Sequence, residues 1–458
     1  MTLIKSISGI RGTIGGKTGD NLTPVDIVKF TAAFVRFQQQ HHHKKEILLV
    51  VGRDARLSGE MAEGLVVSTA TGMGARVINA GLSTTPTVEM AVILSNADGG
   101  IILTASHNPK QWNALKLLNE KGEFLNNAEG RRVLALAENL DFAFAEVDHL
   151  GTLTEDGTFI DRHIASVLGL NLVNPSLIEK SGFKVVVDAV NSTGGIAIPR
   201  LLKALGVKEV IEINCDPTGE FAHNPEPLPE NLTEIASVVV TEKADLGIVV
   251  DPDVDRLAFV MENGKMFGEE YTLVAVADYV LQNQPGNTVS NLSSTRALRD
   301  ITEKAGGHYY AAAVGEVNVV AKMKEKQAVI GGEGNGGVIY PELHYGRDAL
   351  VGTALFLTYL AQKKMKVSAL RASYPNYFIS KNKMALPENT PVDTLFERVK
   401  KAYAQYPMVD IDGLKIEFPD GWVQLRTSNT EPIIRIYAES TSMKKAESYA
   451  KDVMKLLQ

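Results

Sequence analysis

The sequence predicts an α/β protein with several domains, and three observations support this prediction. The chain has 458 residues, too many for one ordinary core at about 150 residues per domain. Apolar, strand-like runs alternate with helical patterns over most of the chain, which indicates mixed, mostly parallel sheets with right-handed crossovers. Near the C-terminus the rhythm changes to paired strands flanked by helices, which predicts a smaller α+β domain.

Three rounds of strands and helices precede that last segment. In the first round a helix opens at Thr23-Pro24, where a capping residue precedes proline, and we expect strands at 47–51 and 75–79 and helices at 59–73 and 87–94. The second round has strands at 184–188, 209–213 and 246–250 and helices at 198–205 and 232–242. The third has helices at 271–281 and 317–324 and strands at 288–291 and 328–330. The final segment has a strand at 378–385, helices at 392–406 and 443–457, and paired strands around Gly421.

Composition excludes several classes of function. Hydrophobic residues make up 45% and charged residues 22% of the chain, and no apolar run reaches the ~18 residues that span a bilayer, so we expect no membrane insertion. The formal net charge of -7 argues against nucleic acid as a partner, because neutralising phosphates requires a basic surface. A single cysteine and an N-terminus without a secretory pattern predict a cytoplasmic protein. Three adjacent histidines at 41–43 lack ligand-like spacing, and we assign them no function.

The hexapeptide TASHNP at 104–109 follows an apolar run at 99–103. Ligands of open α/β sheets bind beyond the carboxyl ends of strands, so a hydroxyl presented there beside an imidazole is well placed for chemistry. Ser106 is therefore our candidate nucleophile or phosphate carrier, with His107 next to it. An ordinary turn is the alternative, because Ser, Asn and Pro are common loop residues.

Three aspartates, Asp251, Asp253 and Asp255, alternate just after the strand expected at 246–250. This spacing lets three carboxylates converge on one hard cation, and we favour Mg²⁺. An EF-hand calcium loop is the main rival, since Glu262 falls at its twelfth position, but Arg256 stands where that loop needs glycine and both flanks read as strands. A solvated acidic turn is the other alternative, although three like charges repel unless a cation offsets them.

These residues belong to a longer set of motifs. TASHNP, followed by Asn113 and Lys116, resembles the phosphoserine loop of the α-D-phosphohexomutases, the family of phosphoglucomutase, phosphomannomutase and phosphoglucosamine mutase. Other stretches fall in that family's order: SGIRG at 8–12, DPDVDR at 251–256, RTSNTEP at 426–432 and, less closely, GEGNGG at 332–337. The resemblance implies three similar α/β domains and a smaller C-terminal α+β domain around a central cleft. We place these four domains at 1–152, 153–258, 259–370 and 371–458.

The resemblance also implies a mechanism. Ser106 would carry a phosphate, and the three aspartates would hold Mg²⁺ with a phosphate oxygen as the fourth ligand. The phosphoserine would donate to a sugar monophosphate, and the resulting sugar 1,6-bisphosphate would reorient and return its other phosphate to serine, which interconverts hexose 1- and 6-phosphates. His107 and Lys116 match the family's active-site loop and either could transfer the proton, Lys116 only with a pKa lowered by nearby cations. Arg11 and Arg256 could supply further positive charge.

Two loops are expected to bind the substrate. Arg426 would clamp a phosphate, helped by hydrogen-bond donors on the residues that follow it, Ser428, Asn429 and Thr430. From the residues alone, plain turn chemistry is the alternative for this loop.

The GEGNGG loop departs from the commonest family pattern. Glu333 matches the acidic residue that binds sugar hydroxyls, Asn335 takes the place of a serine, and Gly337 stands where many members carry histidine. This form resembles phosphoglucosamine mutases of the archaeal type. We therefore expect glucosamine phosphate as the substrate, with glucose and mannose phosphates as alternatives.

Two other classes of function stay open: a phosphatase or other phosphotransferase that uses Ser106, and a noncatalytic sugar-phosphate sensor. A sensor has no need for a nucleophile beside a metal, so the combination of Ser106, the three aspartates and Arg426 disfavours it. The expected partner is a small-molecule sugar phosphate, and we expect a monomer or a homodimer.

Overall fold

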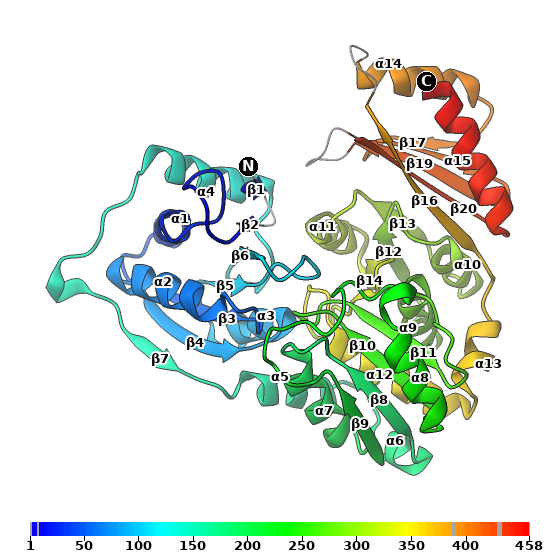
Figure 1. Cartoon of the computed structure of the whole chain (residues 1–458), viewed down its shortest axis with the longest axis horizontal. Coiled ribbons are helices and arrows are strands. Elements are labelled where there is room, and N and C mark those ends of the chain that lie inside the picture. The colour runs from blue at the N-terminus through cyan, green and yellow to red at the C-terminus, as the bar shows by residue number, and fades with distance from the viewer. Residues whose placement is uncertain (1, 7–8, 387–390, 428–432, 458) are drawn as a thin grey trace. The chain divides into compact units, whose positions relative to one another are not determined.

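The computed structural model describes residues 2–6, 9–386, 391–427 and 433–457 (Figure 1). The chain folds into two compact units. The first unit contains Met1–Thr272 and Asn335–Ser368, and the second contains Leu273–Gly334 and Ala369–Gln458.

A seven-stranded mixed sheet forms the N-terminal part of the first unit, in the order β1-β2-β6-β5-β3-β4-β7. The half with β5, β3, β4 and β7 is parallel, whereas β1, β2, β6 and β5 pair antiparallel. The strand bounds are β1 Ile4–Ser6, β2 Gly9–Thr13, β3 Leu48–Arg53, β4 Arg76–Leu82, β5 Gly99–Leu103, β6 Trp112–Leu118 and β7 Leu153–Glu155. Residues 104–111 thus connect two central antiparallel neighbours, β5 and β6. The last strand, β7, adds to this sheet residues that we had assigned to the second domain.

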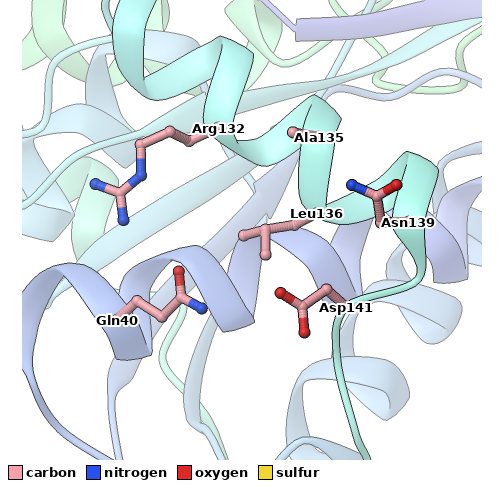
Figure 2. A pocket seen from close by; sticks show the side chains of 6 residues that line it. All are labelled: Gln40, Arg132, Ala135, Leu136, Asn139 and Asp141. Carbon is pink, nitrogen blue, oxygen red and sulfur yellow. The ribbon is translucent and has the colours of Figure 1, made fainter.

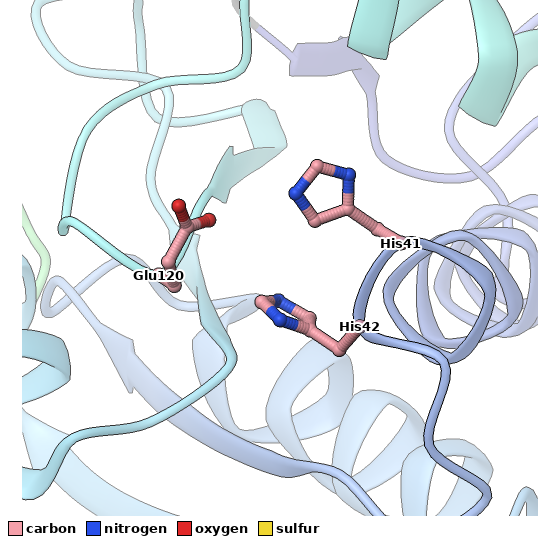
Figure 3. A group of neighbouring side chains, drawn as sticks. All are labelled: His41, His42 and Glu120. Atoms are coloured by element: carbon pink, nitrogen blue, oxygen red, sulfur yellow. The ribbon is translucent and has the colours of Figure 1, made fainter.

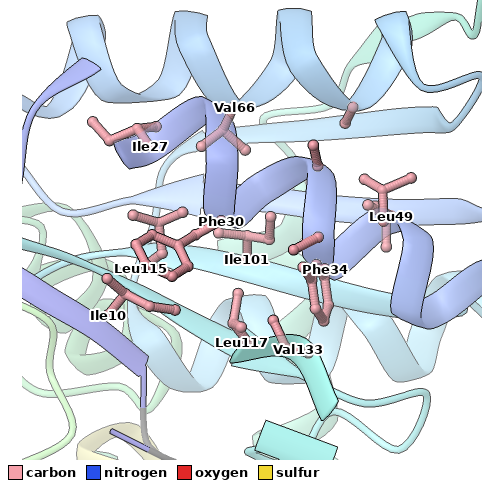
Figure 4. Close-up of a cluster of buried hydrophobic side chains, with 14 of the residues drawn as sticks. Ile10, Ile27, Phe30, Phe34, Leu49, Val66, Ile101, Leu115, Leu117 and Val133 are labelled. Carbon is pink, nitrogen blue, oxygen red and sulfur yellow. The ribbon is translucent and has the colours of Figure 1, made fainter. Parts of the chain in front are cut away.

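Helices cover both faces of this sheet. One face packs on α1 Pro24–His42, α2 Gly59–Gly72 and α4 Asn127–Asn139, and the other on α3 Thr85–Ser95 and α5 Phe159–Leu168. Helix α1 starts where the sequence predicts, because Thr23 caps it in a capping box with Asp26. Figure 4 shows its apolar side chains meeting those of the sheet, with Phe30 and Phe34 facing Ile101 and Leu117.

The second sheet of the first unit has the order β11-β10-β8-β9. Its strands are β8 Lys184–Asp188, β9 Glu209–Ile213, β10 Leu246–Val250 and β11 Leu257–Met261, with helices α6 Pro175–Ser181, α7 Gly194–Ala204 and α8 Thr233–Thr241 and 3-10 turns at Val147–His149 and Pro229–Asn231. Strand β15 Gly337–Ile339 and helix α12 Ala349–Lys363 also belong to this unit. Because α12 is buried from Ala349 to Ala361, it has no polar face, and the amphipathic pattern that reveals a helix is absent.

The second unit contains two further sheets. Strands β13 Tyr309–Ala312, β12 Asn287–Asn291 and β14 Ala328–Glu333 lie side by side in parallel, with α10 Ala297–Lys304 and α11 Glu316–Lys326. The C-terminal sheet is antiparallel, in the order β16-β20-β19-β18-β17. Its elements are β16 Phe378–Ala385, β17 Met408–Val409, β18 Leu414–Phe418, β19 Gly421–Thr427, β20 Ile433–Ser440, α14 Val392–Ala402 and α15 Met443–Leu457. Helices α9 Glu269–Asn283 and α13 Val367–Ala372 carry the chain from one unit to the other.

The predicted fold class is confirmed: three α/β domains precede a smaller α+β domain with an antiparallel sheet. The four domain boundaries stay predictions. Among the described residues, no helix is both long and apolar enough to cross a membrane.

We expect Phe34→Ala to destabilise the first unit strongly. The Phe34 ring is fully buried between α1 and the sheet, and removing a buried phenyl group costs about 3–5 kcal/mol. Differential scanning calorimetry should show a lower midpoint for one unfolding transition. Val25→Ala on the same helix is the control, because Val25 is 60% exposed and should change stability by less than ~0.5 kcal/mol. Equal midpoints for the two variants would contradict this assignment of the core.

Candidate active site

The loop at 104–111, called here the Ser106 loop, begins where the fully buried strand β5 ends. Ser106 adopts a left-handed conformation, with φ of 49°, which is uncommon outside glycine and is typical of constrained functional loops. Its amide donates to Thr104 Oγ1 at 2.9 Å. The Ser106 hydroxyl donates to Asp251 Oδ2 at 2.7 Å and lies 3.3 Å from His107 Nδ1. The predicted nucleophile therefore contacts the predicted metal ligands directly.

A buried arginine, Arg56, holds the backbone of this loop. Its Nε donates to Asp54 Oδ2 at 3.0 Å, and both side chains are fully buried. Three of the remaining N–H groups donate to loop carbonyls, of Pro109 at 3.0 Å, of Asn108 at 2.8 Å and of Ser106. The fourth donates to the carbonyl of Trp112, at the start of β6, at 3.0 Å. All five donors of the guanidinium are thus used. The loop owes its shape to this one side chain, which the sequence reasoning missed.

The acidic loop, residues 251–256, begins where the buried strand β10 ends. The side chains of Asp251, Asp253 and Asp255, called here the aspartate triad, are buried and lie close enough together to share one cation. Val254 between them has φ of 63°, a costly conformation for a β-branched residue. Thr85, at the start of α3, fixes Asp253 twice, because its amide donates to the Asp253 carbonyl at 2.8 Å and its hydroxyl to Oδ2 at 2.6 Å.

Two cations partly balance the triad. Lys116 Nζ lies 2.6 Å from Asp253 Oδ2 and 3.5 Å from Asp255 Oδ2, and Arg347 Nη2 donates to Asp255 Oδ2 at 2.6 Å. No described residue donates a hydrogen bond to Asp253 Oδ1 or Asp255 Oδ1, although both atoms are buried. Buried carboxylate oxygens without donors are costly unless a cation binds them. These three carboxylates therefore fit a divalent metal ion that prefers oxygen ligands.

The pKa shifts in the site follow from burial and close charges. Burial, together with the charges of Asp253 and Asp255, raises the pKa of Asp251 well above its usual range. Burial alone would lower the pKa of Lys116, but the carboxylates of Asp253 and Asp255 raise it. A general base needs a lowered pKa, and this was our condition for Lys116. The raised pKa of Lys116 in the structure does not meet that condition. Burial and the nearby Arg256 lower the pKa of His107 to about 3.

The remaining arginines near these loops have different partners. The Arg256 amide donates to Asp251 Oδ1 at 3.1 Å, while its guanidinium reaches Glu226 at 3.4 Å. Arg11 lies on β2 opposite Ala114 of β6, and burial lowers its pKa. Both arginines therefore belong to the first unit, as the Ser106 loop does.

The predicted substrate-binding residues fall in both units. In the second unit, the Glu333 carboxylate accepts from Asn291 Nδ2 at 2.7 Å and from the Gly315 amide at 3.2 Å. Arg426, at the end of β19, donates from Nε to Asp412 at 3.1 Å. Asn335 belongs to the first unit, and its side chain accepts from the Gly337 amide at 3.3 Å. Ser428, Asn429 and Thr430 lie outside the described residues.

The first unit also contains a hollow and a histidine cluster, which lie on other elements than the Ser106 loop and the aspartate triad. A hollow of about 220 Å³ lies between α1 and α4, lined by Gln40, Arg132, Ala135, Leu136, Asn139 and Asp141 (Figure 2). Two of the adjacent histidines, His41 and His42, face Glu120 (Figure 3). His42 is already engaged, because its Nε2 lies 3.0 Å from the Asp98 carbonyl.

Sequence reasoning also missed Thr85 and Arg347. Each lies close to the start of a helix, Thr85 in α3 and Arg347 just before the Asp348 cap of α12. A capping residue ahead of an apolar run could have revealed these helix ends. The pattern carries no signal for the distant aspartate that each residue contacts.

We expect His107 to stay neutral down to about pH 4, because its pKa of about 3 lies below that range. Histidine-selective NMR should show no titration of its ring carbons between pH 5 and 8, with the resonance assigned from the His107→Gln variant. His223 is the internal comparison, since its hydrogen bond to Asp188 outweighs burial and raises its pKa. A midpoint near 6.5 for His107 would contradict the buried environment described here.

Comparison with known proteins identifies the family. Four models named phosphoglucomutase/phosphomannomutase match the chain: alpha/beta/alpha domain I at residues 3–144, domain II at 161–264, domain III at 268–377 and the C-terminal domain at 383–456. A phosphoglucomutase/phosphomannomutase of Thermococcus kodakarensis is 36% identical over 98% of each chain. A probable phosphoglucosamine mutase of Methanopyrus kandleri is 31% identical over 96% of this chain and 94% of its own.

Comparison with solved structures supports the same family. The crystal structure of a phosphoglucomutase/phosphomannomutase family protein from Burkholderia thailandensis superposes with a TM-score of 0.84 at 27% identity, covering 99% of this chain and 98% of the other. The family models together extend over nearly the whole chain and include both the Ser106 loop and the aspartate triad. The chain belongs to the phosphoglucomutase/phosphomannomutase family, the α-D-phosphohexomutases.

Proposed function

We propose that this protein is a phosphoglucosamine mutase, which interconverts glucosamine 6-phosphate and glucosamine 1-phosphate through a phosphate carried on Ser106. The observation that carries the proposal is the 2.7 Å hydrogen bond from the Ser106 hydroxyl to Asp251 within a buried acidic cluster. A phosphate on this oxygen would lie against the three carboxylates, so it requires a cation there. A cytoplasmic location also stays a prediction.

Asp251, Asp253 and Asp255 would hold Mg²⁺. When bound, the ion neutralises charge on the transferring phosphoryl group. The fit rests on the carboxylate oxygens of Asp253 and Asp255 that have no donor among the described residues. A sugar 1,6-bisphosphate would be the intermediate that returns a phosphate to Ser106.

Lys116 is the better candidate for proton transfer. Its ammonium is held by Asp253 and Asp255, which raise its pKa. Once these carboxylates are bound to a divalent cation they attract the ammonium less, and the pKa of Lys116 falls toward the range of a general base. His107 lies 3.3 Å from the Ser106 hydroxyl but, with a pKa of about 3, is a weak proton acceptor. We therefore assign His107 to orienting the serine oxygen.

Glu333, Asn335 and Arg426 would bind the sugar phosphate, together with Ser428, Asn429 and Thr430. Glu333 is buried and held in place by Asn291. A carboxylate attracts the ammonium of glucosamine more strongly than the hydroxyl of glucose, which places glucosamine phosphate first. The relative from Thermococcus kodakarensis supports the alternative, a phosphoglucomutase/phosphomannomutase. Arg11 and Arg256 would add positive charge for the phosphates.

Ser106→Ala should abolish turnover of glucosamine phosphate, by at least ~10³-fold, because it removes the oxygen that carries the phosphate. The fold should persist, since a loop hydroxyl is lost without opening a core cavity. Phosphorus NMR of the reaction and intact-mass measurement of the protein provide the readouts. Wild-type protein and Ser448→Ala, an exposed serine on α15, should both carry a phosphate-sized mass increment that Ser106→Ala lacks.

The same assay separates a mutase from a phosphatase. A mutase keeps the transferred phosphate on sugar, whereas a phosphatase releases inorganic phosphate in proportion to substrate consumed. Near-normal turnover by folded Ser106→Ala, or stoichiometric phosphate release by the wild type, would contradict the proposal.

We expect glucosamine phosphate to have the highest kcat/KM among glucosamine, glucose and mannose phosphates. Glu333→Gln should narrow its lead over glucose phosphate by about fivefold, since a charge-assisted hydrogen bond becomes a neutral one worth ~1 kcal/mol less. Parallel rate measurements on the three sugars provide the test. A higher kcat/KM for glucose or mannose phosphate in the wild type would overturn the choice of substrate and leave the mutase mechanism standing.

A further inference from the structure

A second cluster of ionisable side chains lies inside the first unit, apart from the aspartate triad. His163 on α5, together with His344 and Asp348 ahead of α12, brings two imidazoles to one carboxylate oxygen. His163 Nε2 lies 3.0 Å and His344 Nε2 lies 3.3 Å from Asp348 Oδ2. The three side chains are at most 2% exposed. Nothing in the proposed mutase mechanism uses them.

The other nitrogen of each histidine lies close to a polar side chain. His163 Nδ1 lies 3.0 Å from the Thr87 hydroxyl, and His344 Nδ1 lies 3.4 Å from Glu89 Oε2. Both neighbours come from α3, and Thr87 orients the His163 ring through a hydrogen bond. A histidine that presents one nitrogen inward while a carboxylate or hydroxyl holds the other is the usual arrangement of a metal ligand and its outer partner.

Asp348 is arranged in the same way. Its Oδ1 caps α12 by accepting from the amides of Leu350 at 2.7 Å and Val351 at 3.3 Å. This fixes the carboxylate and leaves Oδ2 to the two histidines. The three inward atoms, His163 Nε2, His344 Nε2 and Asp348 Oδ2, all lie within 4.8 Å of one another.

These separations match those around a zinc ion. With ligands at ~2.0–2.1 Å in a tetrahedron, neighbouring ligand atoms are about 3.3 Å apart. The two hydrogen-bond separations of 3.0 and 3.3 Å are close to that value. Charge also favours a cation, because the carboxylate of Asp348 is fully buried. Buried carboxylates need a compensating positive charge. A divalent cation bound to Asp348 would supply it.

We propose that His163, His344 and Asp348 bind a divalent metal ion of the zinc type, at a structural site separate from the aspartate triad. Two imidazoles and one carboxylate favour zinc, whereas Mg²⁺ prefers oxygen ligands alone. Water would complete a four-coordinate site. Glu89 and Thr87 act as the outer partners that orient the two histidines.

Such an ion would link α3 and the start of α12, the two segments that contact the aspartate triad. Thr85, two residues before Thr87 on α3, contacts Asp253, and Arg347, adjacent to Asp348, contacts Asp255. A metal bound to Asp348 and His163 would thus connect α3, α5 and the start of α12 behind the acidic loop. Its loss should lower the stability of the first unit, because an ion that binds only the folded state stabilises it.

The test is a zinc count on untagged protein. Chelator-treated wild type is reloaded with zinc in excess Mg²⁺, freed of unbound ion and analysed by mass spectrometry of the elements. We expect about one zinc per chain, lost in His163→Gln and His344→Gln. The matched control is His41→Gln/His42→Gln, which removes the histidines of the cluster in Figure 3 and should still bind about one zinc per chain.

Two measurements keep the proposal testable if the histidine variants fail to fold. Cobalt added to the wild type should give the intense visible absorption of a four-coordinate site with imidazole ligands. Glu89→Gln should weaken zinc binding ~10–100-fold, as loss of an outer partner does. Zinc well below one equivalent in the reloaded wild type, a pale six-coordinate cobalt spectrum, or unchanged zinc in folded His344→Gln would each overturn the proposal.

Discussion

The geometry of the site depends on the buried guanidinium of Arg56. A loop that reverses direction between β5 and β6 leaves several carbonyl groups pointing inward, and buried carbonyls must find donors. Arg56 satisfies three of them and the carbonyl of Trp112, and it neutralises Asp54 at the same time. Because each donor of a planar guanidinium points in a fixed direction, the loop can adopt only a narrow range of conformations. Ser106 is therefore held in its left-handed conformation before any substrate binds.

The aspartate triad sets a second constraint, which is electrostatic. Three carboxylates are buried within one loop, and Lys116 and Arg347 together cannot satisfy every oxygen. Burial raises the pKa of Asp251, and the charges of Asp253 and Asp255 raise it further. A site in this condition gains free energy from any divalent cation small enough to enter. The proposed zinc site also places a cation beside a buried carboxylate. Its two imidazole nitrogens favour zinc, whereas the oxygen ligands of the aspartate triad favour Mg²⁺.

Much of this organisation could be predicted from the sequence. Strands β8, β9 and β10 were predicted to the residue. Strands β8 and β10 are short, largely apolar runs ended by polar loops, whereas β9 also contains Glu209 and Glu212. Helix α12 was missed because its burial on all sides removes the periodic pattern. Likewise, α10 and β13 were missed in the third round. Complete burial therefore explains why α12 was missed, whereas α10 was missed although its buried Leu298 and Ile301 give it an amphipathic pattern.

Some residues of the candidate site could be predicted from the local sequence, and others could not. Ser106 and the three aspartates were predicted from compact motifs and do meet in the structure. Arg56 and Arg347 act through contacts to residues 50 and 92 positions away, and local sequence carries no information about such partners. The sign of the Lys116 pKa shift was also beyond reach, because it depends on which carboxylates lie within a few ångströms.

The position of Arg347 in the chain bears on how the protein matures. Arg347 and Asp348 belong to the first unit, yet they follow the acidic loop by about the length of a domain and are separated from it by part of the second unit. Asp255 and Arg347 are 92 positions apart, which at ~5–20 residues per second corresponds to about 5–20 s of translation. During that interval the nascent first unit contains three clustered carboxylates with Lys116 but without Arg347. Ribosome-bound chains would therefore expose an anionic, incompletely packed surface, and early uptake of a cation would protect it until synthesis reaches α12.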